Sequence, residues 1–402
     1  MPAITGTAGG RNGTAPRDSR ADFYRTLLTG GVDFAALNRH VRSCETPVNV
    51  SMVVNNACNL HCRHCYLQVP ALADRALSDA DWERIFISAL RSDITMLSLN
   101  GKEVFLGDKG PALLARLAAL RRKLSPTKRF GVITNGTLIA PHRELIENAD
   151  LTFFDISVDG LPQDHDVIRG PGAFDQVRPN LEWAARTLDS RFFVSLTAQK
   201  QNLPRFNEAV LHLNHLGVQN VGMSFFHPAV YNDASLTLSE NDYVALFNRL
   251  HVLSSAKLEH PLTVFVEVDT LCPEALVAFL RSDWFSLNRI EMDRSRVPWI
   301  DYAFPNGFRM QFKFFPIPWA GYHSVRITPE GSVLAVDDIF NTRLYPLRTL
   351  ATAREHSCDF SAMMRAAQQS PRTHQLLTNY YDHLLPRIIE AVKTETLIPA
   401  LH

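Results

Sequence analysis

The sequence is poor in cysteine and carries no excess of either charge. Six of its 402 residues are cysteine, and 41 Lys and Arg residues balance 41 Asp and Glu residues. A balanced charge gives no support for nucleic-acid binding, which usually needs a basic face. No apolar run of about 18 residues appears, so no transmembrane helix is expected. We therefore predict no nucleic-acid partner and no membrane partner.

The start of the sequence also lacks the apolar segment of a secretory signal. Residues 1–20 are rich in Gly, Ala, Thr and Arg and are predicted to form a disordered tail. Few cysteines indicate a reducing compartment, so a cytoplasmic protein is expected. The content of 46% hydrophobic and 20% charged residues is typical of a globular protein.

Half of the cysteines are concentrated in one short segment. Cys58, Cys62 and Cys65 are spaced C-x3-C-x2-C, while the other three are scattered. Soft thiolates suit iron, and three of them can hold three corners of a cube-shaped [4Fe–4S] cluster. No fourth cysteine lies close in sequence, so one iron would stay open for a ligand that is not protein. We predict one [4Fe–4S] cluster on these three cysteines.

A zinc site is the alternative for the same segment. Zinc would take the three cysteines together with His61 or His64. Zinc ribbons and knuckles usually carry a second paired motif, which this sequence lacks. A disulfide-linked loop is disfavoured because three close cysteines cannot pair evenly. A non-catalytic metal-binding scaffold or sensor is thus the alternative function from another class.

Extended apolar runs alternate with amphipathic stretches between residues 48 and 226. The expected strands are 48–55, 95–99, 130–133, 151–158, 192–197 and 221–226, and the expected helices are 79–91, 111–123, 141–148, 173–188 and 205–216. Strands separated by helices predict an α/β fold with a parallel sheet. Six such units rather than eight fit a partial (β/α)6 TIM-like barrel. Its active site would lie at the C-terminal ends of the strands.

Four segments are expected along the chain. They are a disordered tail at 1–20, an N-terminal helical segment at 21–46, the barrel core at 47–235 and a C-terminal extension at 236–402. The extension is predicted to hold a helix at 239–255 capped by Ser239, a strand at 262–268, an irregular aromatic segment at 284–322, a hairpin at 323–337 around Pro329-Glu330-Gly331, and two helices at 359–394 broken by Pro371.

The cysteine spacing resembles the signature of the radical S-adenosylmethionine (radical SAM) enzymes. The resemblance implies that the open iron binds S-adenosylmethionine and that one electron from the cluster cleaves it. The 5′-deoxyadenosyl radical released in this way would abstract a hydrogen atom from a substrate. An electron donor such as flavodoxin or ferredoxin is implied as a partner.

Further motifs that resemble this family follow in the expected order. They are Gly101-Lys102-Glu103-Val104, which is similar to Gly-Gly-Glu-Pro apart from Lys102 and Val104, then Thr134-Asn135-Gly136, Ser157-Val-Asp159-Gly160 and His165-Asp166-x-x-Arg169-Gly170. By resemblance, Glu103 would bind the amino group of S-adenosylmethionine. Ser157 and Arg169 would bind its carboxylate, a contact that suits a guanidinium. The implied cofactor-binding residues are His64, Tyr66, Gly101, Glu103, Thr134, Asn135, Ser157 and Arg169.

The hairpin at 323–337 resembles the SPASM or twitch module of radical SAM maturases, but in degenerate form. Where that module has a cysteine, this sequence has Val336, and no cysteine cluster follows. The loss of auxiliary clusters favours redox-neutral outcomes such as epimerisation, rearrangement or elimination. An epimerase needs a hydrogen-atom donor, for which Cys272 and Cys358 are the candidates, with Cys44 behind them. A buried cysteine is more often a small hydrophobic residue.

The leading hypothesis is a radical SAM enzyme of oxidoreductase or isomerase type with a single [4Fe–4S] cluster. Its substrate would be a peptide or an amino-acid-derived natural-product precursor, as the resemblance to maturases implies. The alternative is the same chemistry on a small metabolite such as a sugar or nucleoside, by an epimerase, isomerase or lyase. That alternative gains weight because only 57 residues precede Cys58, too few for a full leader-peptide-binding domain.

Overall fold

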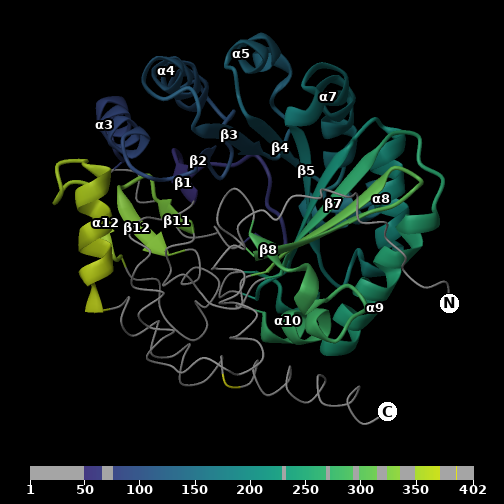
Figure 1. Ribbon diagram of the computed structural model, residues 1–402. Helices are drawn as coiled ribbons and strands as arrows, with labels where there is room; N and C mark the ends of the chain where they lie inside the picture. Colours follow the sequence, from purple (N-terminus) through teal and green to yellow (C-terminus); the bar gives the residue numbers. More distant parts are fainter. Residues whose placement is uncertain are drawn as a thin grey trace, which may run out of the picture.

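A computed structural model describes residues 49–65, 76–228, 232–268, 272–292, 298–314, 324–335, 349–371 and 386. Its centre is one curled sheet with helices along the outer side (Figure 1). Seven strands follow the chain order and are parallel to their neighbours: β1 (Asn49–Val53), β2 (Met96–Asn100), β3 (Arg129–Thr134), β4 (Phe153–Ser157), β5 (Phe192–Ala198), β6 (Asn220–Phe225) and β7 (Leu262–Val268). The predicted partial TIM-like barrel is confirmed, and β7 continues its parallel order.

Helices connect successive strands and cover the outer face of the sheet. They are α3 (Asp79–Leu90), α4 (Lys109–Leu124), α5 (Arg143–Asn148), α6 (Pro162–Arg169), α7 (Ala173–Thr187), α8 (Phe206–His215), α9 (Glu240–Leu250) and α10 (Pro273–Leu280). In α3, Ser78 and Asp81 form a capping box at the first turn. Trp82, Ile85 and Phe86 recur at helical spacing and are fully buried against the sheet layer.

Helix α9 was predicted from the sequence, whereas helix α6 was not. The expected helix at 239–255 is confirmed as α9 followed by a short 3-10 helix, and Ser239 caps it through a capping box with Asp242. Helix α6 was not expected. It has only eight residues with Pro162 in its first turn, so it is too short to show a clear periodic pattern. It nevertheless carries Arg169 to the carboxyl end of the sheet.

The alternation along β5 shows which side of the sheet forms the core. Every second residue from Phe192 to Ala198 is buried towards the helices. The residues between them face the inner side, where Phe193 packs edge-to-face on Phe265 of β7. The inner face also carries polar side chains, and Ser195 donates a hydrogen bond to Asp155 of β4 at 2.5 Å. The barrel therefore has an apolar outer layer and a partly polar interior.

The sheet continues past β7 through a segment that we expected to be irregular. β10 (Phe308–Phe314) pairs in parallel with β7, and β9 (Pro298–Ala303) and β8 (Glu291–Met292) follow in antiparallel order. For its described residues, the expectation of an irregular 284–322 segment is wrong. The aromatic residues alternate along β10, and Phe312 packs on Phe279 of α10 and Trp284. An alternating apolar run of this kind is a strand signal.

The C-terminal hairpin extends the opposite edge of the sheet. β11 (Ser324–Ile327) and β12 (Ser332–Ala335) are antiparallel, as predicted, and Gly331 in the turn adopts a φ of 88°. β11 pairs in parallel with β1, with Arg326 opposite Ser51. β13 (Ala351–Thr352) then pairs with β12, and α12 (Phe360–Gln369) packs near α3 (Figure 1). A hairpin distant in sequence thus lies beside the first barrel strand.

Several predicted features lie outside the described residues. They are the tail at 1–20, the helical segment at 21–46, Tyr66, Val336 and most of the second C-terminal helix. Among the residues that are described, no helix is both long enough and apolar enough to cross a membrane.

Candidate cluster and cofactor site

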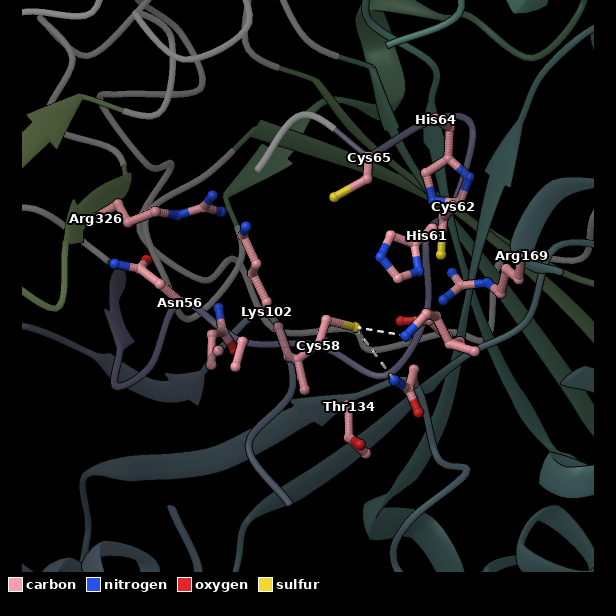
Figure 2. Close-up of a pocket in the computed structure, with 17 residues that line it drawn as sticks. Asn56, Cys58, His61, Cys62, His64, Cys65, Lys102, Thr134, Arg169 and Arg326 are labelled. Atoms are coloured by element: carbon pink, nitrogen blue, oxygen red, sulfur yellow. Dashed lines mark hydrogen bonds between the residues drawn. The ribbon is translucent and has the colours of Figure 1, made fainter. Parts of the chain in front are cut away.

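The three cysteines follow the carboxyl end of β1 and line a cavity of about 620 Å³. Their side chains approach this cavity from different sides (Figure 2). Among the described residues, no three His, Cys, Asp or Glu side chains gather closely enough to hold a single metal ion. Three soft thiolates at one cavity are the donor set that holds an iron–sulfur cluster.

Burial dominates the electrostatics of the cysteine thiols. It raises the pKa of Cys62 to about 11, although the Arg169 guanidinium acts in the opposite direction. It also raises the pKa of Cys58, while hydrogen bonds from Leu60 and Asn135 oppose this. Metal binding must therefore displace protons from these thiols.

Arg169 is held at the cavity by a buried ion pair. Its Nε donates to Asp159 Oδ2 at 2.6 Å, and Asp159 is fully buried. Burial raises the pKa of Asp159, but Arg169, His64 and His165 outweigh it and bring the value to about 2. His64 Nδ1 lies 3.7 Å from the same carboxylate oxygen, and burial lowers the His64 pKa to about 4. The pair keeps a permanent guanidinium at the cavity wall.

The loop after β2 places backbone at the cavity and buries its carboxylate. Gly101 and Lys102 line the cavity, whereas Glu103 is only 1% exposed. Both Glu103 oxygens accept hydrogen bonds, from Thr134 Oγ1 at 2.7 Å and from the Asn135 backbone N at 2.8 Å. In this structure, Glu103 therefore ties the β2 loop to the β3 loop.

The start of this loop leaves little room for a side chain at Gly101. A Cβ on Gly101 would lie 2.8 Å from Asn55 Oδ1. Asn55 in turn donates from its side chain to the Glu103 carbonyl at 2.7 Å. The close approach of this loop to the end of β1 explains the glycine in physical terms.

Most of the residues implied by the resemblance lie together at the cavity. Its lining includes Cys58, Cys62, Cys65, His64, Gly101, Thr134, Asn135, Ser157 and Arg169. These side chains come from the ends of β1 to β4 and from α6, which is where a barrel of this kind carries its site.

The two candidate hydrogen-atom donors lie elsewhere. Cys272 precedes α10 with its sulfur 2.8 Å from the Tyr243 hydroxyl, and Cys358 lies near Asp81 of α3. Both are buried in the outer layers, and neither lines the cavity. The structure therefore does not bring them to the three cysteines.

Two further residues line the cavity without a sequence motif that assigns them to the site. Lys102 replaces a glycine of the family motif, and its side chain extends into the cavity (Figure 2). Arg326 comes from β11, is 7% exposed, and lies on the side of the cavity away from Arg169 (Figure 2). No local motif marks Arg326, because the pairing of β11 with β1 alone brings it here.

Comparison with known proteins identifies the family that this site resembles. Residues 52–203 match the Radical SAM superfamily. A curated relative, the pre-heme d1 synthase of Dinoroseobacter shibae, is 32% identical over 142 residues. That alignment spans 34% of this chain and only 33% of the relative, so it covers about a third of each protein.

Solved structures share the fold at low identity. SuiB of Streptococcus suis superimposes with a TM-score of 0.61 at 14% identity, covering 89% of this chain and 78% of that one. Native anSMEcpe with bound AdoMet and the Cp18Cys peptide gives a TM-score of 0.54 at 15% identity, covering 83% and 82%. These structures show a shared fold, and the family match over residues 52–203 identifies that segment as a radical SAM domain; the cofactors of this superfamily are a [4Fe–4S] cluster and S-adenosylmethionine.

Proposed function

We propose that this protein is a radical SAM enzyme that modifies a peptide or an amino-acid-derived natural-product precursor. The observation that carries the proposal is the convergence of Cys58, Cys62 and Cys65 on one cavity with Ser157 and Arg169 at its wall. When bound, the cluster and S-adenosylmethionine supply a 5′-deoxyadenosyl radical that abstracts a hydrogen atom from the substrate.

The residues of the chain would hold and orient these groups. The three cysteines would hold the cluster at this cavity. Arg169, fixed by Asp159, presents a guanidinium that suits the carboxylate of S-adenosylmethionine.

The peptide assignment is supported by the fold relatives. SuiB has been solved with its precursor peptide SuiA, with a TM-score of 0.56 against this chain at 15% identity. The anSMEcpe structure also holds a peptide. A small metabolite is the second candidate, because the curated relative is named for a heme product rather than a peptide.

The reaction type is proposed to be redox-neutral. After Cys272 the given sequence contains one cysteine, Cys358, and a single cysteine does not supply the ligand set of an auxiliary cluster. An auxiliary cluster is one route by which an electron leaves the substrate radical. Without it, epimerisation, rearrangement or elimination is favoured over net oxidation.

The test is anaerobic reconstitution of the full chain followed by reaction with dithionite and S-adenosylmethionine. We expect about four irons per chain and release of 5′-deoxyadenosine. Cys58→Ala should abolish this release, whereas Cys272→Ala, a matched change at a buried cysteine away from the cavity, should leave it intact. Binding of a single zinc without 5′-deoxyadenosine would contradict the proposal and favour a non-catalytic metal scaffold.

Substrate class is tested by deuterium transfer. A deuterated peptide or metabolite that is the substrate should pass deuterium into 5′-deoxyadenosine. A redox-neutral outcome predicts a product of unchanged oxidation state, measured by mass spectrometry. A product two mass units lighter than the substrate would show a net oxidation instead.

A further inference from the structure

One hydrogen bond to a cysteine of the site comes from a side chain that the resemblance assigns to S-adenosylmethionine. The Asn135 side-chain amide lies with Nδ2 3.7 Å from Cys58 Sγ, and the backbone N of Leu60 lies 3.4 Å from the same sulfur. The two dashed lines at Cys58 in Figure 2 mark hydrogen bonds to its sulfur. Both distances suit N–H···S hydrogen bonds. We propose that Asn135 tunes the reduction potential of the cluster through Cys58. This rests on the proposed function, since it requires a cluster on the three cysteines.

The orientation of the Asn135 amide is set by its other partners. Its Oδ1 accepts from the Thr137 backbone N at 2.9 Å and from Thr137 Oγ1 at 2.7 Å. With the oxygen engaged there, the NH2 group must face the opposite way. It does so, donating to Asn59 Oδ1 at 2.9 Å as well as to the Cys58 sulfur.

The same contacts close into a ring. Asn59 Nδ2 donates to Thr137 Oγ1 at 2.8 Å, the Thr137 hydroxyl donates to Asn135 Oδ1, and Asn135 Nδ2 donates to Asn59 Oδ1. A flip of the Asn135 amide would set oxygen against oxygen at Asn59 and nitrogen against a donor at Thr137. The ring therefore holds one N–H of Asn135 towards the sulfur.

The backbone of Asn135 is anchored as well. Its N–H donates to Glu103 Oε2 at 2.8 Å, and Thr134 Oγ1 donates to Glu103 Oε1. Asn135 is 6% exposed and Glu103 is 1% exposed, so water competes little for these contacts. The buried Glu103 carboxylate thus acts on the site by positioning the donor of the Cys58 hydrogen bond.

The direction of the effect follows from charge. A cysteine sulfur bound to iron keeps lone pairs that accept hydrogen bonds, and the potential of such clusters depends on those bonds. Reduction adds negative charge to the cluster, and the positive end of an N–H dipole stabilises the added charge. Asn135 is therefore inferred to raise the potential and to make the cluster easier to reduce.

The test is a redox titration of the reconstituted full chain, followed by electron paramagnetic resonance of the reduced cluster. Asn135→Leu keeps a similar side-chain size and removes the donor. We expect the ratio of reduced to oxidised cluster at a fixed potential to fall about tenfold, equal to a shift of about −59 mV for one electron. Exchange into deuterated water should also change the resonance signal of the reduced cluster less in this variant, because the variant lacks the exchangeable N–H proton that couples to the cluster.

Two further variants separate tuning from a general structural role. Thr137→Val removes the hydroxyl that orients the amide and should shift the potential in the same direction by less. Asn56→Leu is the matched control, because Asn56 lines the same cavity but donates to Glu330 at 2.7 Å. Its potential should equal that of the wild type.

The outcomes distinguish this inference from the proposed function. If the wild type holds four irons but Asn135→Leu has the wild-type potential, Asn135 does not tune the cluster. If Asn135→Leu assembles no cluster, Thr137→Val decides, and an unchanged potential there overturns the inference. If the wild type itself assembles no reducible cluster, the proposed function fails first.

Discussion

The buried pair of Asp159 and Arg169 gives the sharpest test of how the site is built. The two side chains meet at 2.6 Å with 0% and 8% side-chain exposure. Asp159→Asn keeps the shape but leaves the guanidinium of Arg169 buried without its counter-charge. Removing one partner of a buried pair typically costs about 3–5 kcal/mol, because the other charge stays uncompensated.

The pKa of Asp159 gives a second measure of the same interaction. It falls from an ordinary 3.8 to about 2 in the folded protein, because the cations around it outweigh burial. A difference of this size corresponds to about 2 kcal/mol of stability. A lowered carboxylate pKa stabilises the fold above pH 4, and this contribution is lost as the pH falls towards 2. We therefore expect Asp159→Asn to lose about 2–5 kcal/mol at pH 7, and the gap to wild type to narrow below pH 4.

The assay is urea unfolding of the metal-free protein, followed by circular dichroism at several pH values. Asp301→Asn is the matched control, because Asp301 pairs with Arg309 at the same 2.6 Å but on the surface. An exposed pair contributes about 0–1 kcal/mol, so this control should stay close to wild type. Replacing both members, as Asp159→Asn with Arg169→Met, should recover part of the loss. Equal losses in Asp159→Asn and Asp301→Asn would refute the reasoning.

Two other changes test the barrel interior. Burial raises the pKa of Asp155 to about 6, and Glu267 acts in the same direction, so the charged carboxylate destabilises the fold above that pH. At pH 8, Asp155→Asn should therefore unfold at a urea concentration equal to or above that of wild type. This gain in stability should disappear by pH 4. A clear loss at pH 8 would mean that the hydrogen bond from Ser195 outweighs the charge. Gly131→Ala would place a Cβ 2.5 Å from the Phe153 ring and should cost about 1–3 kcal/mol in urea unfolding, and an unchanged midpoint would contradict that packing.

Local patterns in the sequence determined much of this fold. The alternation of apolar strands and amphipathic helices predicts β1 to β6 because each unit buries one face against the next. The capping box at Ser239 marks the start of α9, since its contacts span only three residues. The C-x3-C-x2-C spacing likewise places three ligands on one loop, whatever the rest of the chain does.

Local patterns failed where an element was short or where its meaning depended on its neighbours. Helix α6 has too few residues to show a period. The segment around β10 was predicted to be irregular although its apolar residues alternate, and its strand is fixed by pairing with β7 and β9. Cys272 and Cys358 were equivalent candidates from sequence, since a cysteine does not reveal which layer it will occupy. Their burial in the outer layers is a result of packing.

The cysteine spacing and the strand–helix order were therefore set by the sequence alone, because both depend on contacts between near neighbours. Tertiary structure alone decided which side chains surround the cysteines. Arg326 reaches the cavity only because β11 pairs with β1, more than 270 residues earlier, and Glu103 turns inward because Thr134 and Asn135 supply its hydrogen bonds. Contacts between distant segments depend on the whole packed sheet, and no local pattern encodes them.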